Sequence, residues 1–502
     1  MLLSAVAGLG MALAFPPFDQ WWLAPVSMAV LVLLLHAVAV TSGPRMPAIS
    51  GALVGGVFGL TFFGALTPWL LVIGPDAYLL IVVLSLAFTA LFGAGAAMVM
   101  RLPAWPLWVA CWWVAVEAAR SRVPFGGFPW GRLAHSQVDA PTMGWVAVGG
   151  VPWLTFVVVL VGALAAWTVL QLRSRRWIAG ALGTAAAALL LLAGLVIPLP
   201  TSGSPVTVAV VQGSVPNTGM DAFGRREAVL DAHLDATHQL AADVRAGTVA
   251  QPDVVIWPEN ASDIDPSLDE SAFDAISAAV DDVGVPVLVG MVVEANGGEN
   301  VANEGTVWLP GDGPSETYVK QHLVPFGEYV PLRAQLSSFI SRLDRIPRDF
   351  VAGTRPGLLT LGPTRIGDVI CFDVAYDSAV RQPVAGGAQI ITVQTNNATY
   401  GETGQVDQQW AISRLRAVEH GRSVVVASTS GISGIIAPDG TVQERAPEFE
   451  QSVIVAPVTQ RTALTLATRL GAWPEAALAL LGLLAVAAGV LAHRHRRDEV
   501  EA

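Results

Sequence analysis

The sequence predicts a multi-span α-helical membrane domain followed by an extracytoplasmic α/β domain. Three observations favour this fold class. Hydrophobic residues make up 53% of the 502 residues and charged residues only 14%, whereas ordinary soluble domains carry about 25% charge. Residues 1–200 hold 8 arginines and 4 acidic residues, while most of the 40 acidic residues fall within 201–470. Beyond residue 204, short β-branched segments alternate with helical ones, a pattern typical of layered α/β folds.

The apolar segments predict about eight membrane-spanning helices, because one span needs about 20 mostly apolar residues. We expect them at about 2–16, 22–40, 50–74, 77–100, 104–120, 145–171, 177–198 and 471–492. The first has no basic segment and no clear cleavage site, so we interpret it as a span and not as a cleaved signal peptide. The expected domains are 1–200 with seven spans, 201–470 outside the membrane, 471–492 as the final span and 493–502 as a basic cytoplasmic tail.

Arginine positions predict the orientation, since cytoplasmic loops are enriched in Lys and Arg. With the N-terminus in the cytoplasm, Arg45, Arg101, the segment 173–176 and the tail 493–497 fall inside, and the acidic domain falls outside.

Three arginines of one outer loop depart from this rule: Arg120, Arg122 and Arg132. They could simply be tolerated there, or they could bind lipid phosphates at the outer leaflet. Glu117, in the preceding span, is expected to form a structural ion pair with Arg120, because residues three apart lie on one helix face.

The composition argues against several classes of protein. A net charge of −12 disfavours a nucleic-acid binder, and two cysteines are too few for a disulfide scaffold. The sequence has no phosphate-binding loop, no dinucleotide-binding glycine motif, no serine-hydrolase motif and no metal-ligand spacing of His and Cys. We therefore expect neither a metal nor a cofactor.

Within the α/β domain, the alternating pattern predicts strands and helices in sequence order. We expect strands at 206–211, 253–256, 285–292, 306–309, 365–371, 390–393, 423–427 and 432–437, and helices at 225–245, 272–280 and 406–420. Residues 330–357 hold several arginines and prolines, and we expect a long loop there of the kind that serves as a lid or binding loop.

Three reactive side chains of this domain lie at the end of an apolar strand or next to a turn. Glu259 follows the strand at 253–256, Lys320 lies beside a Pro/Gly turn, and Cys371 ends the strand at 365–371. Lys320 is the single lysine among 28 basic residues, which suggests that its position needs a compact cation with a movable pKa. A thiol nucleophile, a carboxylate base and a cation that stabilises an oxyanion would together form a catalytic site.

Each of these residues also has a structural interpretation. Cys371 could be a buried inert thiol, Glu259 could be a helix N-cap or a surface acid, and a single lysine could remain by chance. The residues taken one by one leave these alternatives open.

Seven sequence motifs occur in one order along the chain. They lie at 128–130, 211–213, 257–259, 320–331, 370–371, 396–401 and 414–422. The glutamate, lysine and cysteine in this order resemble the nitrilase superfamily. Together with the membrane segments, the whole set resembles the apolipoprotein N-acyltransferase family.

The resemblance implies a nitrilase-like α-β-β-α sandwich for the outer domain. It implies Cys371 as nucleophile, Glu259 as general base, Lys320 as oxyanion stabiliser and Glu328 as a supporting acid. Phe372 and Asp373, where the family often has Tyr and Glu, are expected to support the site. The residues expected to bind substrate are Arg120, Arg122, Trp130 and Tyr400.

The resemblance also implies the reaction, a ping-pong transfer of a fatty acyl chain through a cysteine thioester. The donor would be a membrane phospholipid, and the acceptor the N-terminal amine of a diacylglyceryl-modified apolipoprotein, in a bacterial cytoplasmic membrane. One alternative is a membrane-anchored nitrilase-type amidase that uses water as acceptor. A second is a transporter or lipid-binding protein whose outer domain is catalytically silent.

Overall fold

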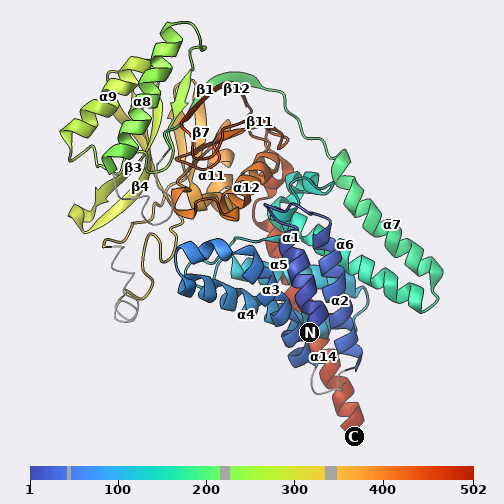
Figure 1. Cartoon of the computed structure of the whole chain (residues 1–502). Coiled ribbons are helices and arrows are strands. Elements are labelled where there is room, and N and C mark those ends of the chain that lie inside the picture. Colours follow the sequence, from blue (N-terminus) through green and yellow to red (C-terminus); the bar gives the residue numbers. More distant parts are fainter. Residues whose placement is uncertain (42–46, 215–225, 334–346, 502) are drawn as a thin grey trace. The chain divides into compact units, whose positions relative to one another are not determined.

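The computed structural model describes residues 1–41, 47–214, 226–333 and 347–501, which divide into two compact units (Figure 1). The first unit holds Met1–Pro198 and Leu470–Ala502, and the second holds Leu199–Arg469. The first is built of helices, whereas every strand of the described chain belongs to the second. The chain therefore leaves the first unit once and returns to it for its last helix.

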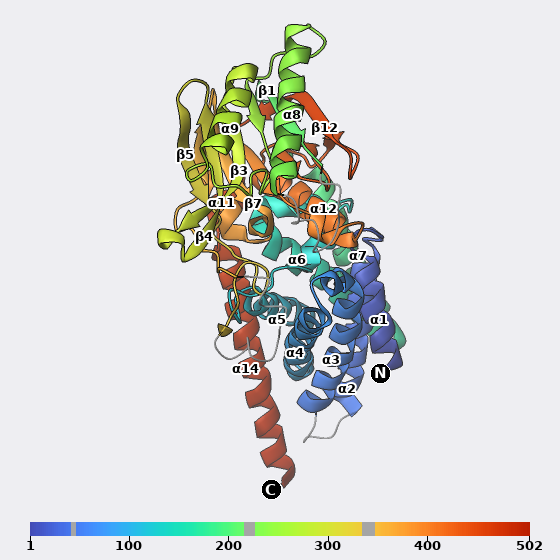
Figure 2. The same ribbon diagram turned by 60° about the vertical axis from the view of Figure 1, so that its left-hand side comes forward.

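The first unit is a bundle of apolar helices, in which α14 packs along α5 (Figure 2). Among the described residues, six helical segments are long and apolar enough to cross a membrane. The helices α1 and α5 have 12 and 16 residues and are shorter than a full span. The multi-span character is thus confirmed, while the number of eight spans stays a prediction. The helices are α1 (Leu2–Leu13), α2 (Leu23–Thr41), α3 (Pro47–Leu66), α4 (Pro75–Val99), α5 (Trp105–Arg120), α6 (Val146–Arg173), α7 (Trp177–Ala193) and α14 (Trp473–Glu501).

Two of the expected spans end earlier than their hydropathy suggested. The segment expected at 50–74 is α-helical only as far as the end of α3, and a 3₁₀ helix follows over Pro68–Val72. The segment expected at 2–16 ends with α1, before Pro16. Proline has no amide proton and restricts the residue before it, so it stops an α-helix inside an apolar run that hydropathy treats as continuous.

The second unit contains two six-stranded sheets. The first has the order β12-β1-β2-β3-β4-β5 and the second the order β11-β10-β9-β8-β7-β6. The central strands β1, β2 and β3 are parallel, as are β7, β8 and β9, and antiparallel strands flank them. The strands are β1 (Ser204–Gln212), β2 (Val254–Ile256), β3 (Val287–Ala295), β4 (Asn300–Leu309), β5 (Gly313–Val319), β6 (Leu358–Leu361), β7 (Thr364–Ile370), β8 (Ile390–Thr395), β9 (Val424–Ser428), β10 (Gly434–Ile436), β11 (Val442–Arg445) and β12 (Ser452–Gln460).

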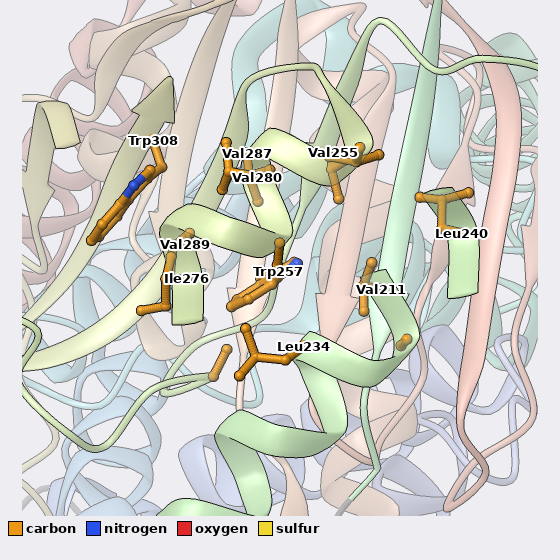
Figure 3. Close-up of a cluster of buried hydrophobic side chains, with 14 of the residues drawn as sticks. Val211, Leu234, Leu240, Val255, Trp257, Ile276, Val280, Val287, Val289 and Trp308 are labelled. Atoms are coloured by element: carbon orange, nitrogen blue, oxygen red, sulfur yellow. The ribbon is translucent and has the colours of Figure 1, made fainter. Parts of the chain in front are cut away.

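Helices cover the outer face of each sheet. The first sheet packs against α8 (Arg226–Arg245) and α9 (Glu270–Val283), and the second against α11 (Asp377–Ala385) and α12 (Gly404–His420). Figure 3 shows Trp257 among Leu234 from α8 and Ile276 from α9, within the core between these helices and the first sheet. A second core of aliphatic side chains lies between the two sheets. The unit is an α-β-β-α sandwich, so the predicted fold class is confirmed.

The apolar pattern located the central strands and missed the edges of both sheets. The predicted elements contain no counterpart of β5, β6, β11 or β12, nor of α11. All four residues of β11 are exposed, and an edge strand that faces solvent has no hydrophobic alternation to reveal it.

Candidate active site

The predicted reactive residues all follow strands of the sandwich. Glu259 lies three residues beyond β2, Lys320 directly follows β5, and Cys371 directly follows β7. Glu328 lies in the loop after Lys320. Residues 334–346 of the long loop expected at 330–357 lie outside the described residues, so its role as a lid stays a prediction.

A buried ion cluster joins the lysine to two carboxylates. Lys320 Nζ lies 3.0 Å from Glu259 Oε1 and 2.8 Å from Glu328 Oε1, and the lysine is 1% exposed. Asn303 Nδ2 donates to the same two oxygens, at 2.7 Å and 3.3 Å. The second oxygen of Glu259 accepts the backbone N–H of Asn396 at 2.8 Å. The orientations of both carboxylates are thereby set by hydrogen bonds.

The cluster keeps the lysine charged. Burial by itself lowers the pKa of Lys320, but the neighbouring carboxylates of Glu259 and Glu328 raise that pKa well above its ordinary value. Burial raises the pKa of Glu328, and Lys320 opposes this shift. A permanent ammonium group thus lies between the two carboxyl groups.

Cys371 adopts a left-handed backbone conformation at the end of β7, with φ of 51°. The predicted strand at 365–371 therefore ends one residue early, at Ile370, and Cys371 begins a 3₁₀ helix over Cys371–Ala375. A residue with a Cβ atom is strained in this conformation, and such strain is typical of functional positions. Residue Cys371 as a whole is partly exposed, in contrast to the buried Cys111.

The electrostatic environment keeps the Cys371 thiol protonated. Burial and then the charge of Glu259 raise the pKa of Cys371 to about 12, while Lys320 and a hydrogen bond from Thr395 lower it. At neutral pH the resting Cys371 side chain is therefore a thiol, and a base would have to remove its proton before the sulfur could act as a nucleophile.

Asp373 secures the turn that carries the cysteine. Its side chain is fully buried and accepts hydrogen bonds from Tyr318 Oη at 2.7 Å and from the backbone N–H of His322 at 2.8 Å. Burial and the charge of Asp373 raise the pKa of Tyr318 well above its ordinary value, so the phenol remains a donor. Phe372 packs edge-on against Tyr376, with ring centroids 5.2 Å apart.

A buried arginine holds the same turn from the other side. Arg416 of α12 is 0% exposed and donates to the carbonyl oxygens of Val374 and Ala375, both at 2.9 Å. It also forms an ion pair with Glu419. The motif at 414–422 therefore fixes the backbone beyond the cysteine.

Tyr400 belongs to the neighbourhood of the cluster. It ends the 3₁₀ helix Ala398–Tyr400, and burial together with the charge of Cys371 raises its pKa. Sequence reasoning missed Asn303, which lies within β4 and contacts both carboxylates. An asparagine inside a buried strand was the one available indication.

Arg120, Arg122 and Trp130 belong to the first unit, where protein groups engage them. Arg120 is buried, donates to the carbonyl oxygens of Phe128 and Trp130 at 2.7 Å, and lies over the ring of Phe63. Arg122 forms an ion pair with Glu475 of α14. The structure gives these residues positioning contacts, and their role in substrate binding stays a prediction.

The expected ion pair between Glu117 and Arg120 is wrong. Glu117 pairs instead with Arg132, whose Nε lies 3.3 Å from Oε2. Glu117 also accepts the backbone N–H of Leu133 at 3.0 Å and the hydroxyl of Thr155 at 2.9 Å. Helical spacing could not indicate this arrangement, because the loop after α5 returns Arg132 to the helix.

Known proteins resemble this chain along nearly all of its length. The profile of the apolipoprotein N-acyltransferase N-terminal domain matches residues 7–164, and that of carbon-nitrogen hydrolases matches residues 207–466. The apolipoprotein N-acyltransferase of Mycolicibacterium smegmatis is 41% identical over 97% of this chain and 85% of that protein. The protein of that name from Pseudomonas paraeruginosa is 31% identical over 96% of this chain and 94% of its own. Among solved structures, a nitrilase-superfamily amidase from Nesterenkonia AN1 has 17% identity and a TM-score of 0.40, covering 56% of this chain and 98% of that chain.

These matches confirm the resemblance that the motifs indicated. They extend through the apolar helices as well as the sandwich, so the likeness is not confined to a shared hydrolase fold. The protein is a membrane enzyme with a carbon-nitrogen hydrolase domain. The chain belongs to the apolipoprotein N-acyltransferase family.

Proposed function

We propose that Cys371 is the nucleophile that carries a fatty acyl group from a membrane phospholipid to the N-terminal amine of a diacylglyceryl-modified apolipoprotein. The observation that carries this proposal is the buried cluster of Lys320, Glu259 and Glu328, whose charges act on the Cys371 thiol. A protonated thiol, a carboxylate and a fixed cation are the groups that acyl transfer through a thioester needs.

The first half-reaction forms the thioester. As Sγ of Cys371 attacks the ester carbonyl, Glu259 takes the thiol proton, and the ammonium group of Lys320 stabilises the oxyanion. Collapse of the intermediate breaks the ester C–O bond. Glu259 returns the proton to the departing lysophospholipid oxygen, so the carboxylate is regenerated.

The second half-reaction transfers the acyl group to an amine. The free α-amine of the diacylglyceryl-cysteine attacks the thioester carbonyl, Glu259 accepts a proton from nitrogen, and Cys371 leaves as the thiol. The amide product carries a third acyl chain. Asn303 and Glu328 support both steps by holding Glu259 and Lys320 in place.

Both substrates of this reaction are anchored in lipid. Each buried CH₂ costs about 0.8 kcal/mol to transfer into water, so an enzyme embedded beside the same leaflet avoids a large extraction cost. The distribution of arginines supports placing the sandwich on the extracytoplasmic face of the bacterial cytoplasmic membrane. We propose Tyr400, Arg120, Arg122 and Trp130 as residues of the lipid-binding surfaces.

Mass spectrometry of the full-length protein tests the proposal. After incubation with vesicles of phosphatidylethanolamine and phosphatidylglycerol, we expect a hydroxylamine-labile fatty acyl mass on the Cys371 peptide. Cys371→Ser should lack the labile adduct. Addition of a diacylglyceryl-cysteine peptide with a free amine should discharge the thioester and give an acylated peptide.

A matched peptide with an acetylated N-terminus is the control, and it should leave the thioester intact. An unmodified Cys371 after incubation would overturn the proposal. Discharge to free fatty acid at equal rates with both peptides would overturn the transferase assignment and favour a hydrolase.

A further inference from the structure

Two buried polar side chains meet at one point between the sheets of the sandwich. Asp368 on β7 and Gln394 on β8 are both 0% exposed. Both extend toward Gly305 on β4 of the other sheet. A Cβ atom added to Gly305 would lie 2.3 Å from Asp368 Oδ2 and 2.4 Å from Gln394 Oε1. The two oxygens therefore converge on a space that is free because residue 305 has no side chain.

The other polar atoms of this pair have partners. Thr392 Oγ1 donates to Asp368 Oδ1 at 2.6 Å, and Gln394 Nε2 donates to the carbonyl oxygen of Trp257 at 2.7 Å. That carbonyl can only accept, so the orientation of the glutamine amide is settled by its partner. Within the described residues, Asp368 Oδ2 and Gln394 Oε1 are left with no donor.

Two buried acceptors that converge on one space are unfavourable unless one carries a proton. An unpaired ionised carboxylate beside an amide oxygen would lose solvation and gain no cation. The titratable groups whose charges bear on Asp368 are Asp373 and Tyr318, and neither supplies a positive charge. Burial raises the pKa of Asp368 to about 7; the hydrogen bonds from Thr392 and from the backbone of Val369 oppose this shift, and the charge of Asp373 adds to it.

We propose that Asp368 is a protonated positioning residue that donates from Oδ2 to Gln394 Oε1. The resulting chain of hydrogen bonds runs from Thr392 through Asp368 and Gln394 to the carbonyl of Trp257. Pro258 and Glu259 follow directly, so the chain ties the second sheet to the turn that carries the proposed base. The positioning role rests on the proposed function of Glu259, whereas the protonation does not.

The turn at residues 257–259 also packs closely against β3 of the first sheet. A Cβ atom at Gly290, which pairs with Gly305 in register, would lie 2.1 Å from the carbonyl oxygen of Pro258. Gly290 thus allows the close approach of the Pro258 carbonyl, and its partner Gly305 allows that of Asp368 and Gln394. Loss of the Gln394 contact should let the Trp257 carbonyl, and with it Glu259, shift.

Infrared spectroscopy of the full-length protein in detergent tests the protonation. We expect the carbonyl band of a buried protonated carboxyl group, and we expect Asp368→Asn to remove it. The exposed Asp312 serves as matched control, since Asp312→Asn should leave the band unchanged. Absence of the band in the wild-type protein at pH 6 would overturn the protonation.

Thermal unfolding as a function of pH gives a second readout. The folded pKa of Asp368 lies above the unfolded value of about 3.9, so the folded state binds the proton more tightly. Between these two values the wild-type stability falls as pH rises, relative to Asp368→Asn, which cannot titrate. A constant difference in Tm between pH 4 and 8 would contradict the proposal.

Two further variants test the positioning role. Asp368→Asn preserves both hydrogen bonds, because its amide can donate to Gln394 and its oxygen can accept from Thr392, and should retain activity within about twofold. Gln394→Leu breaks the chain and should lower kcat at least tenfold with little change in KM. It should also shift the pH dependence of Cys371 alkylation, which reports the position of Glu259 without any acyl transfer. An unchanged alkylation profile in a folded Gln394→Leu protein would refute the positioning role.

Discussion

Replacing Glu259 by glutamine should separate the reactivity of the thiol from the catalytic reaction. The negative charge of Glu259 raises the pKa of Cys371 after burial, and Lys320 opposes it. A neutral amide at position 259 removes the negative charge of Glu259. The ammonium group of Lys320 then has Glu328 as its remaining carboxylate partner in the cluster. Glu259→Gln should therefore make the thiol more acidic while removing the proposed general base.

The size of the effect follows from the usual influence of a neighbouring charge on a pKa. A charge within about 4–6 Å shifts a pKa by about 1–3 units, so the thiolate fraction at pH 8 should rise about 10- to 1,000-fold. The intrinsic nucleophilicity of a thiolate falls as its pKa falls, with a Brønsted coefficient of about 0.5. The net increase in alkylation rate is therefore about 3- to 30-fold, whereas turnover should fall by at least about 100-fold.

The assay follows iodoacetamide modification of the Cys371 peptide between pH 7 and 9, in full-length protein in detergent. The buried Cys111 is an internal control whose modification should not change. Glu299→Gln, which alters an exposed carboxylate of the same domain, should change neither alkylation nor turnover. Slower alkylation of folded Glu259→Gln would refute the electrostatic reasoning, because it would mean that Glu259 promotes the resting thiolate.

Two further predictions concern stability. Lys320→Met leaves two buried carboxylates without their cation. The loss should lower the free energy of unfolding by about 3–5 kcal/mol and the Tm by roughly 10 °C in thermal unfolding. A fall in Tm of less than about 2 °C would contradict the role of the lysine in the cluster. Arg416→Met removes the donors to two carbonyls of the turn beyond Cys371 and the ion pair that Arg416 forms with the buried Glu419. We expect a similar loss of Tm and slower thioester formation in single-turnover measurements, and an unchanged acylation rate would show that the turn does not depend on this arginine.

The fold class followed from the sequence because its two main patterns are strong. Long apolar runs and buried β-branched strands produce hydrophobic patterns that need no knowledge of tertiary contacts. The edge strands, such as β11, lie in solvent and carry no such pattern. Hydropathy could not predict that α3 ends before Pro68, because this end depends on the backbone restrictions that proline imposes.

The residues of the candidate site could be predicted from their positions relative to strands and turns. Glu259 and Cys371 each follow an apolar strand and Lys320 stands beside a Pro/Gly turn, and reactive groups at the ends of rigid elements are typical of α/β enzyme sites. Asn303 could not be recognised, because its strand is antiparallel and its contacts depend on the loop that carries Glu328. The left-handed conformation of Cys371 likewise depends on the hydrogen bonds made by Asp373 and not on local propensity.

The charges of the site favour a nucleophile that ionises only during attack. With Lys320 positive and two carboxylates negative, a resting thiolate would add a further negative charge to a buried cluster, which agrees with the raised pKa of Cys371. Transfer of the thiol proton to Glu259 leaves the total charge of the cluster unchanged. In the proposed reaction, the lysophospholipid leaves with the proton, and the free carboxylate of Glu259 can then accept a proton from the incoming amine. A single base paired with a fixed cation is therefore sufficient for both proposed half-reactions. The ester needs to reach the thiol, and the amine then needs to reach the thioester at the same sulfur.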